Sequence, residues 1–156
     1  SLRRSPVGKG LRLNEGSDVT LAAIGNRVHP ALEAAQLLGD MGISAGVLNM
    51  RFVKPLDQAL LKAAAAQTPA LVTIEDNALE GGFGSAVLEA LAADQAPQAH
   101  VLRLGIPDHF IAHGAPSLLY DTVGLSPQKI AQRVGEWLRP RTVNGRRPER
   151  AAAIGS

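Results

Sequence analysis

Three acidic residues and a run of glycines are the side chains of this chain whose types and spacing could do chemistry. Glu75, Asp76 and Glu80 follow an apolar run, and Gly81-Gly82-Phe83-Gly84-Ser85 comes directly after them. Paired carboxylates can carry out acid–base chemistry or bind a cation. Backbone N–H groups at a glycine-rich helix start can hold an anion.

The acids also have a structural alternative. They could pair with Arg51 and Lys54 at the end of a neighbouring strand and brace the turn. An ion-paired or interface cluster around Glu75 is the more common outcome for such residues, and the sequence leaves both alternatives open.

The glycine run differs from known phosphate-binding patterns. After Gly82 and Gly84, the third glycine of the dinucleotide fingerprint is replaced by Val87, and the Lys and Ser/Thr of a P-loop are absent. The pattern therefore favours close packing of the helix start at Gly81, Gly82 and Gly84 against a neighbouring backbone, within the domain or across a subunit interface.

The histidines do not predict a metal site. A zinc site needs about three or four converging ligands, and the two closest histidines lie in a segment rich in glycine and proline without a Glu between them. A loop histidine at the rim of an active site remains an option for His113, because loops on rigid folds carry function. The four histidines are His29, His100, His109 and His113.

These residues must be positioned by alternating strands and helices. Short apolar runs bounded by turn residues predict strands at 18–25, 45–50, 70–75 and 99–104. Helical spacing and capping residues predict helices at 30–41, 55–66, 84–93 and 127–138, with a loop at 108–116. The alternation predicts an α/β fold: three layers, with a mainly parallel, possibly mixed, sheet of about five strands and helices on both faces.

Composition limits the class of protein. The chain has 156 residues, 46% of them hydrophobic but only 3% aromatic, so its core must be built from Ala, Val, Leu and Ile. The absence of cysteine excludes disulfides and thiolate metal sites. No apolar run approaches the roughly 18–20 residues that span a bilayer. We expect a cytoplasmic protein without membrane contact. Because the chain starts at Ser1 rather than Met, we expect a processed, trimmed or fragmentary start.

The basic charge is concentrated at the two ends. Residues 1–12 hold four basic residues and no acid, and residues 139–156 hold five arginines and one Glu. Each end thus carries +4, so the net charge of +2 leaves residues 13–138 at −6. A nucleic-acid-binding protein usually gathers its basic charge on a folded face. We therefore predict no nucleic-acid partner, and a basic tail at 139–156 that is disordered.

Several ordered motifs resemble one known family. The stretch Leu48-Asn49-Met50-Arg51-Phe52-Val53-Lys54-Pro55-Leu56-Asp57 and the loop Gly105-Ile106-Pro107-Asp108-His109-Phe110-Ile111-Ala112-His113-Gly114 are similar to the C-terminal domain of transketolase-type enzymes. Within that group they most resemble the 1-deoxy-D-xylulose 5-phosphate synthases. The resemblance covers about residues 6–138, and residues 6–10 look like the segment that leads into this domain. The domains expected are a linker at 1–12, the transketolase C-terminal-like domain at 13–138 and the tail at 139–156.

The resemblance implies a parent enzyme rather than an active site in this chain. Such synthases are thiamine diphosphate- and magnesium-dependent transferases that join pyruvate to glyceraldehyde 3-phosphate with loss of CO2, for isoprenoid and thiamine biosynthesis. Their cofactor-binding and catalytic residues lie upstream of this domain, so no catalytic, cofactor or metal residue is carried over. The implied role is structural: contact with the upstream domains and with a homodimer partner.

Two groups of alternatives stay open. The chain could be the equivalent domain of a transketolase or of a 2-oxo acid dehydrogenase β-subunit, or a stand-alone α/β module that binds an anionic ligand at the Gly81–Ser85 turn. It could also be an adaptor that grips nucleic acid with its basic ends. The residues expected at an interface or active-site rim are Arg51, Lys54, Glu75, Gly81, Gly82, Gly84 and His113.

Overall fold

The computed structural model describes residues 7–78, 82–93, 99–106 and 115–139. Five strands form one sheet in the order β1-β3-β2-β4-β5. The strands are β1 (Leu11–Asn14), β2 (Val19–Ala23), β3 (Ala45–Asn49), β4 (Ala70–Ala78) and β5 (His100–Ile106). β2, β3, β4 and β5 are parallel, and β1 pairs antiparallel with β3 at the edge. The sheet is therefore mixed, as the sequence allowed.

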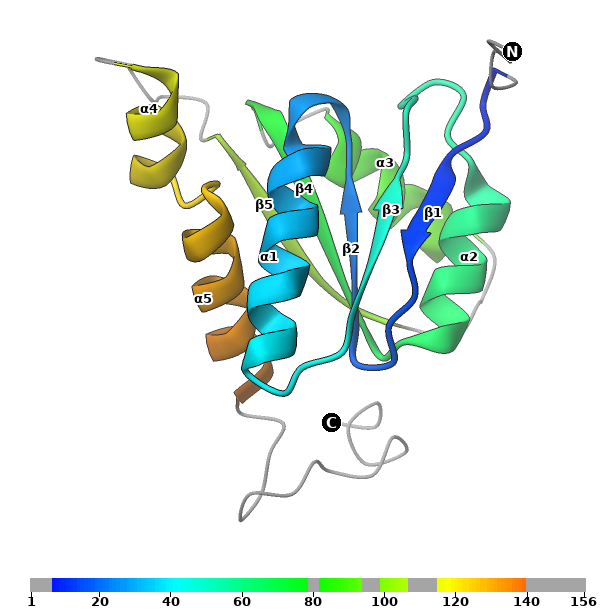
Figure 1. The fold of residues 1–156 in the computed structure, drawn as a ribbon. Helices are drawn as coiled ribbons and strands as arrows, with labels where there is room; N and C mark the ends of the chain where they lie inside the picture. The colour runs from blue at the N-terminus through cyan, green and yellow to red at the C-terminus, as the bar shows by residue number, and fades with distance from the viewer. Residues whose placement is uncertain (1–6, 79–81, 94–98, 107–114, 140–156) are drawn as a thin grey trace, which may run out of the picture.

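Helices cover both faces of the sheet (Figure 1). The helices are α1 (Val28–Asp40), α2 (Gln58–Gln67), α3 (Phe83–Ala92), α4 (Pro116–Thr122) and α5 (Pro127–Leu138), with a short 3-10 turn, η1 (Gly25–Arg27), before α1. This confirms the α/β fold with three layers. None of the described helices is long and apolar enough to cross a membrane.

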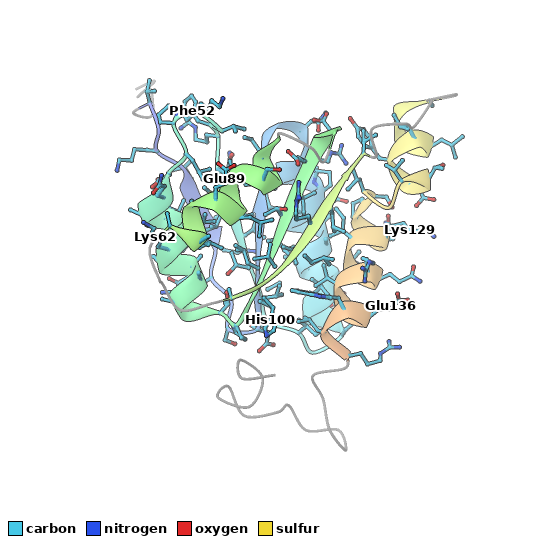
Figure 2. The ribbon with its side chains drawn as sticks, turned by 180° about the vertical axis from the view of Figure 1, so that it is seen from behind. Phe52, Lys62, Glu89, His100, Lys129 and Glu136 are labelled. Atoms are coloured by element: carbon cyan, nitrogen blue, oxygen red, sulfur yellow. The ribbon has the colours of Figure 1, made fainter. Side chains whose placement is uncertain are left out.

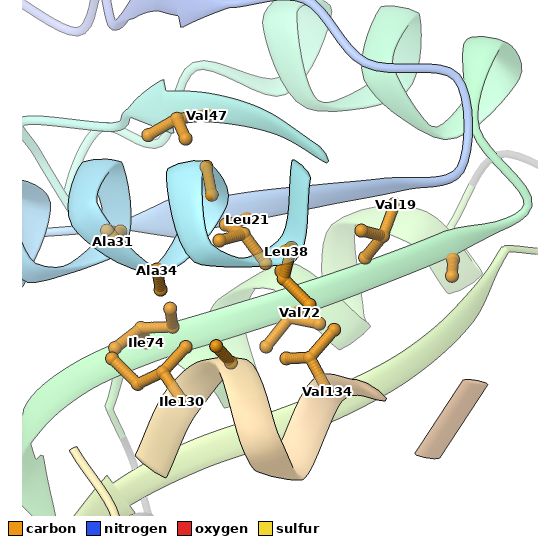
Figure 3. Close-up of a cluster of buried hydrophobic side chains, with 14 of the residues drawn as sticks. Val19, Leu21, Ala31, Ala34, Leu38, Val47, Val72, Ile74, Ile130 and Val134 are labelled. Carbon is orange, nitrogen blue, oxygen red and sulfur yellow. The ribbon is translucent and has the colours of Figure 1, made fainter. Parts of the chain in front are cut away.

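The core consists of two apolar clusters that share the sheet. One lies under α1 and α5 and contains Leu21, Leu38 and Val72 (Figure 3). The other lies under α2 and α3 and contains Leu61 and Leu71. Side chains of successive strand residues point to opposite faces, so Leu71 and Val72 of β4 enter different clusters. The buried core consists mainly of Ala, Val, Leu and Ile, as expected, with Met50 and Phe83 as the exceptions.

Two elements differ from the sequence-based expectation. Residues 11 and 12, expected in the linker, begin β1, and α4 follows the segment expected as a loop. The start of α2 also differs. Pro55 lies before the helix, after a cis Lys54–Pro55 bond, and Asp57 is the N-cap, accepting a hydrogen bond from Leu60 N at 3.1 Å.

Candidate functional site

The carboxyl ends of the parallel strands form one edge of the sheet, and this edge holds most of the expected site residues. β2 leads into η1 and α1, while the adjacent β4 leads toward α3. α1 belongs to one face of the sheet and α3 to the other. Neighbouring strands whose connections leave to opposite faces mark the position where open α/β sheets place ligand crevices. The β2–β4 junction is therefore the first place to look for a site.

A polar cluster fills this junction. The side-chain amide of Asn26 donates to Asp76 Oδ2 at 2.8 Å and to the Tyr120 hydroxyl at 3.0 Å. The Tyr120 hydroxyl also lies 3.4 Å from Asp76 Oδ2. Arg27 stacks on the Tyr120 ring with 3.5 Å between its guanidinium carbon and the ring centre. The four side chains thus join η1, β4 and α4.

Arg27 is the buried member of this cluster, with 5% of its surface exposed. Its guanidinium donates to the Leu125 carbonyl at 3.0 Å and to Asn26 Oδ1 at 2.9 Å. Burial lowers the pKa of Arg27, and the neighbouring Tyr120 and Asp76 oppose that shift. Because Nε and Nη1 of Arg27 donate to Asn26 and to the Leu125 carbonyl, the cluster holds the α4–α5 connection against the sheet edge.

Glu75 lies beside this cluster but serves another element. Only 1% of Glu75 is exposed, and its two carboxylate oxygens accept hydrogen bonds from Phe83 N at 2.6 Å and from Gly84 N at 3.3 Å. These amides belong to the first turn of α3, whose N–H groups lack partners within the helix. A carboxylate at a helix N-terminus is stabilising. Glu75 therefore occupies the position at which an anion would bind.

The glycines next to Glu75 serve close packing. A Cβ atom on Gly84 would lie 2.6 Å from Arg103 Nε and 3.1 Å from Thr73 Oγ1. Arg103 itself donates to Ser85 Oγ at 3.0 Å. Gly82 is the residue before α3 and is in an extended conformation. The helix start is thus closely packed at Gly84, but its near neighbours are the side chains of Arg103 and Thr73 rather than the backbone expected from the sequence.

Arg51 and Lys54 lie in the loop between β3 and α2. Arg51 has a φ of 63°, which is unusual for a residue other than glycine. Its N–H donates to Asn49 Oδ1 at 3.1 Å, and its guanidinium carbon lies 5.7 Å from the centre of the Phe52 ring. Lys54 is exposed. Within the described residues, neither side chain forms an ion pair.

The structure therefore separates residues that the sequence analysis placed together. Pairing of Glu75 with Arg51 or Lys54 assumed that β3 and β4 are neighbours, but β2 lies between them. Of the alternatives that the sequence left open, the ion pair of Glu75 with Arg51 or Lys54 is therefore not formed among the described residues, because Glu75 accepts hydrogen bonds from the start of α3. Gly81 and His113 lie outside the described residues.

Asn26, Arg27 and Tyr120 come together only in the folded chain. Asn26 and Tyr120 are 94 positions apart in the chain, and no local spacing connects them. The one available signal was an Asn-Arg pair directly after a buried strand, at the carboxyl end where polar residues are expected to meet.

The described residues do not fit magnesium or a diphosphate. They contain no group of three or more His, Cys, Asp or Glu side chains that could hold a metal ion. The two amides at the glycine-rich helix start are bonded to Glu75.

Comparison with known proteins decides the family. The family model for the C-terminal domain of transketolase matches residues 8–130. The chain belongs to the transketolase C-terminal domain family. This transketolase C-terminal domain is 46% identical over 131 residues to the 1-deoxy-D-xylulose-5-phosphate synthase of Synechococcus sp. (strain CC9605). The aligned segment covers 84% of the chain and 20% of that relative. It is 50% identical over 130 residues to 1-deoxy-D-xylulose-5-phosphate synthase 1 of Geobacter sulfurreducens, again over 20% of the relative.

Solved structures agree with this assignment. A split-gene transketolase, described as an inactive β4 tetramer, superposes with a TM-score of 0.79 at 37% identity, over 86% of this chain and 43% of the other. Transketolase from Pichia stipitis superposes with a TM-score of 0.61 at 18% identity, over 90% of this chain and 19% of the other, which supports the fold alone. The chain thus spans about a fifth of the curated relatives named above.

Proposed function

We propose that this chain is the C-terminal structural and dimerisation domain of a thiamine diphosphate-dependent synthase. The parent enzyme would condense pyruvate with glyceraldehyde 3-phosphate to 1-deoxy-D-xylulose 5-phosphate and CO2. The observation that carries this proposal is the identity of 46–50% to curated synthases over 83–84% of the chain. In these relatives the similar segment makes up 20% of a longer protein, which supports the proposal.

In this proposal the domain performs no chemistry. Thiamine diphosphate and magnesium would bind to upstream domains, in a cytoplasmic homodimer. Two features of the described residues support this division of labour: the Glu75 carboxylate already occupies the start of α3, and the ligands of a metal site are not assembled. The polar cluster around Arg27 is used to hold α4 and α5 in place.

The first test is the intact mass of the natural gene product, measured before purification can clip it. We expect a mass several times 16.3 kDa, and formation of 1-deoxy-D-xylulose 5-phosphate when the long product is given pyruvate, glyceraldehyde 3-phosphate, thiamine diphosphate and magnesium. A product of 16.3 kDa, or a long product that makes no such sugar phosphate, would contradict the proposal.

The second test concerns the isolated chain. Titration calorimetry with thiamine diphosphate and magnesium should give no binding heat beyond dilution. Stoichiometric binding would show that the cofactor site lies at least partly in this domain.

The stand-alone anion-binding module is the weaker alternative. It needs the amides of Phe83 and Gly84 to be available, and Glu75 counts against that. A phosphate titration followed by the amide resonances of these two residues separates the alternatives, because a bound anion would shift them and the proposed structural role predicts no shift.

A further inference from the structure

Exposed apolar side chains are concentrated where the chain enters the domain. Six large hydrophobic residues of the described part are exposed. Three of them lie within its first seven residues: Val7 at 74%, Leu11 at 46% and Leu13 at 39%. The others are separate from one another, on or next to α1, α3 and α4. Single exposed apolar residues need no explanation, but a group of them marks an interaction site.

Leu11 of this group lies on a part of the sheet that no described helix covers. Leu11 pairs with Asn49 of β3, and Asn49 shares a face with Val47, which is buried in the cluster under α1 and α5. Leu11 therefore points to the face that carries α1 and α5. In Figure 1, α1 and α5 lie on the side of β2, β4 and β5, and no helix lies in front of β1.

β1 is also an edge strand, with β3 on one side and no described strand on the other. A strand edge of this kind exposes unpaired backbone groups, and proteins usually cover it or protect it with charge. β1 has three of the usual protections, since it is only four residues long, contains Arg12 and has a bulge between Arg12 and Asn14, and it also carries the exposed Leu11 and Leu13.

The loop after β3 extends this surface. Gly8 packs so closely on Pro55 that a Cβ atom on Gly8 would lie 2.8 Å from Pro55 Cγ. Gly10 N donates to Asp57 Oδ2 at 2.9 Å. The entering chain and the 51–57 loop are therefore fastened together. Figure 2 shows Phe52 of this loop at the end of the molecule opposite His100.

The loop after β3 also brings positive charge to this surface. Arg51 and Lys54 lie on this loop without an ion pair among the described residues, in a body whose net charge is −6. Arg51 also keeps a left-handed backbone conformation, which for a residue other than glycine persists only where the surroundings impose it. The loop thus presents two cations beside a partly exposed aromatic ring.

We propose that these residues form an entry surface that docks the part of the parent polypeptide preceding residue 1. The entry surface consists of Val7, Leu11, Leu13, Arg51, Phe52 and Lys54. This inference rests on the proposed function, because it requires upstream domains. It goes further by naming the face that they contact and the chemistry of the contact: an apolar patch flanked by acidic groups that pair with Arg51 and Lys54.

Chain connectivity favours this occupant over a second copy. The upstream chain would be joined only six residues before Val7, so its effective concentration at the entry surface would be in the millimolar range expected for short linkers. A second copy has no such advantage. The size of the relatives provides ample chain, since the domain makes up 20% of them.

Photo-crosslinking of the full natural gene product tests the inference. p-Benzoylphenylalanine is placed at position 13 or 52, and at position 88 as a matched control, because Leu88 is 38% exposed against 39% for Leu13. We expect crosslinks from positions 13 and 52 to peptides upstream of residue 1, and none above background from position 88.

Three outcomes would overturn the inference. Crosslinks that join two copies of this domain would assign the entry surface to self-association. A long gene product without crosslinks at positions 13 and 52 would contradict docking at the entry surface but not the proposed function. A gene product of the length of this chain would contradict both the docking inference and the proposed function. The mass measurement therefore distinguishes failure of the docking inference alone from failure of the proposed function.

A charge-reversal variant gives an independent readout. Leu13→Glu combined with Arg51→Glu in the full product should speed proteolytic separation of this domain from the upstream chain, while Leu88→Glu should not. The melting temperature of the isolated chain carrying the same changes should stay close to that of the unchanged chain, because both sites are on its surface. Unchanged proteolysis of the full product would contradict the inference.

Discussion

Glu75 takes the place of a bound anion at the start of α3. Its carboxylate is 1% exposed and accepts hydrogen bonds from two helix amides. Charge-assisted hydrogen bonds of this kind are stronger than neutral ones. A residue that could have been catalytic is therefore better explained as the cap of a helix.

Replacing this carboxylate should destabilise the chain. We expect Glu75→Ala to lower the free energy of unfolding by about 2–3 kcal/mol, because two buried amides lose a charged acceptor. Urea denaturation of the isolated chain measures the change. Glu89→Ala, on the exposed side of the same helix, is the control and should stay within about 0.5 kcal/mol. An equally small effect of Glu75→Ala would contradict the capping role.

Replacement by alanine should change the stability of the chain in opposite directions at two helical glycines, Gly84 and Gly135. A methyl group on Gly84 meets Arg103 at 2.6 Å, whereas on Gly135 it meets only Met41 Cε at 3.6 Å, an ordinary contact. We expect Gly84→Ala to destabilise by about 1–3 kcal/mol through overpacking. Gly135→Ala should stabilise by up to about 1 kcal/mol through helix propensity. Thermal unfolding of both variants checks the signs, and stabilisation by Gly84→Ala would show that the helix start is loosely packed.

At the scale of elements, the Arg27 cluster joins parts of the chain that are far apart in sequence. Arg27 bonds the Leu125 carbonyl at the start of α5 and stacks on Tyr120 of α4. We expect Arg27→Ala to cost about 2–3 kcal/mol, since it removes a buried stack and leaves a carbonyl without its donor.

Hydrogen exchange distinguishes this anchoring role from a general loss of stability. In Arg27→Ala, the amides of Leu119 and Val123, which hydrogen-bond within α4, should exchange faster by a larger factor than those of α2. Arg133→Ala, which removes an exposed arginine of α5, is the control and should leave both patterns unchanged. A uniform increase across α2 and α4 would argue against local anchoring.

The elements also show what the sequence could and could not predict. β2, β3 and the first half of β4 are largely buried apolar runs, and β5 is a partly buried, mostly apolar run, so the positions of these strands followed from hydrophobicity within a few residues. β1 was missed because it has four residues and its leucines are exposed, which leaves no burial pattern to detect. α4 was missed because it has only seven residues and follows a segment rich in glycine and proline.

The site was less predictable than the elements because it depends on strand order. Glu75 and Asp76 lie in the carboxyl-terminal half of β4 and Glu80 lies outside the described residues, but an ion pair with Arg51 or Lys54 requires β3 to be the neighbouring strand. Once β2 lies between them, Asp76 meets Asn26 and Glu75 meets the start of α3. Periodicity along one strand carries no information about which strand lies beside it.

At the scale of the whole molecule, the two apolar clusters are linked through a common sheet. β4 supplies Val72 to the cluster under α1 and α5, and Leu71 to the cluster under α2 and α3. The helices on one face therefore hold in place the same strands on which the helices of the other face pack. We expect the domain to unfold in one transition rather than face by face.

The single tryptophan provides a test of this coupling. Trp137 packs against the α1–α5 cluster, while Leu61 is fully buried in the other one. Leu61→Ala should lower the free energy of unfolding by about 2–5 kcal/mol. Because the sheet is shared, the urea midpoint of Trp137 fluorescence should fall as far as the midpoint of far-UV circular dichroism.

The matched control is Leu38→Ala, which creates a similar cavity in the cluster that contains the tryptophan's neighbours. Both variants should shift both probes equally if the sheet couples the two faces. A fluorescence midpoint that moves in Leu38→Ala but not in Leu61→Ala would mean that the faces unfold separately. A partner that binds only the folded state raises the stability of the whole unit that unfolds with its binding site. If the faces unfold separately, contact of the entry surface with another domain would therefore stabilise only the part of the sheet next to β1. If the domain unfolds as one unit, the same contact stabilises every element.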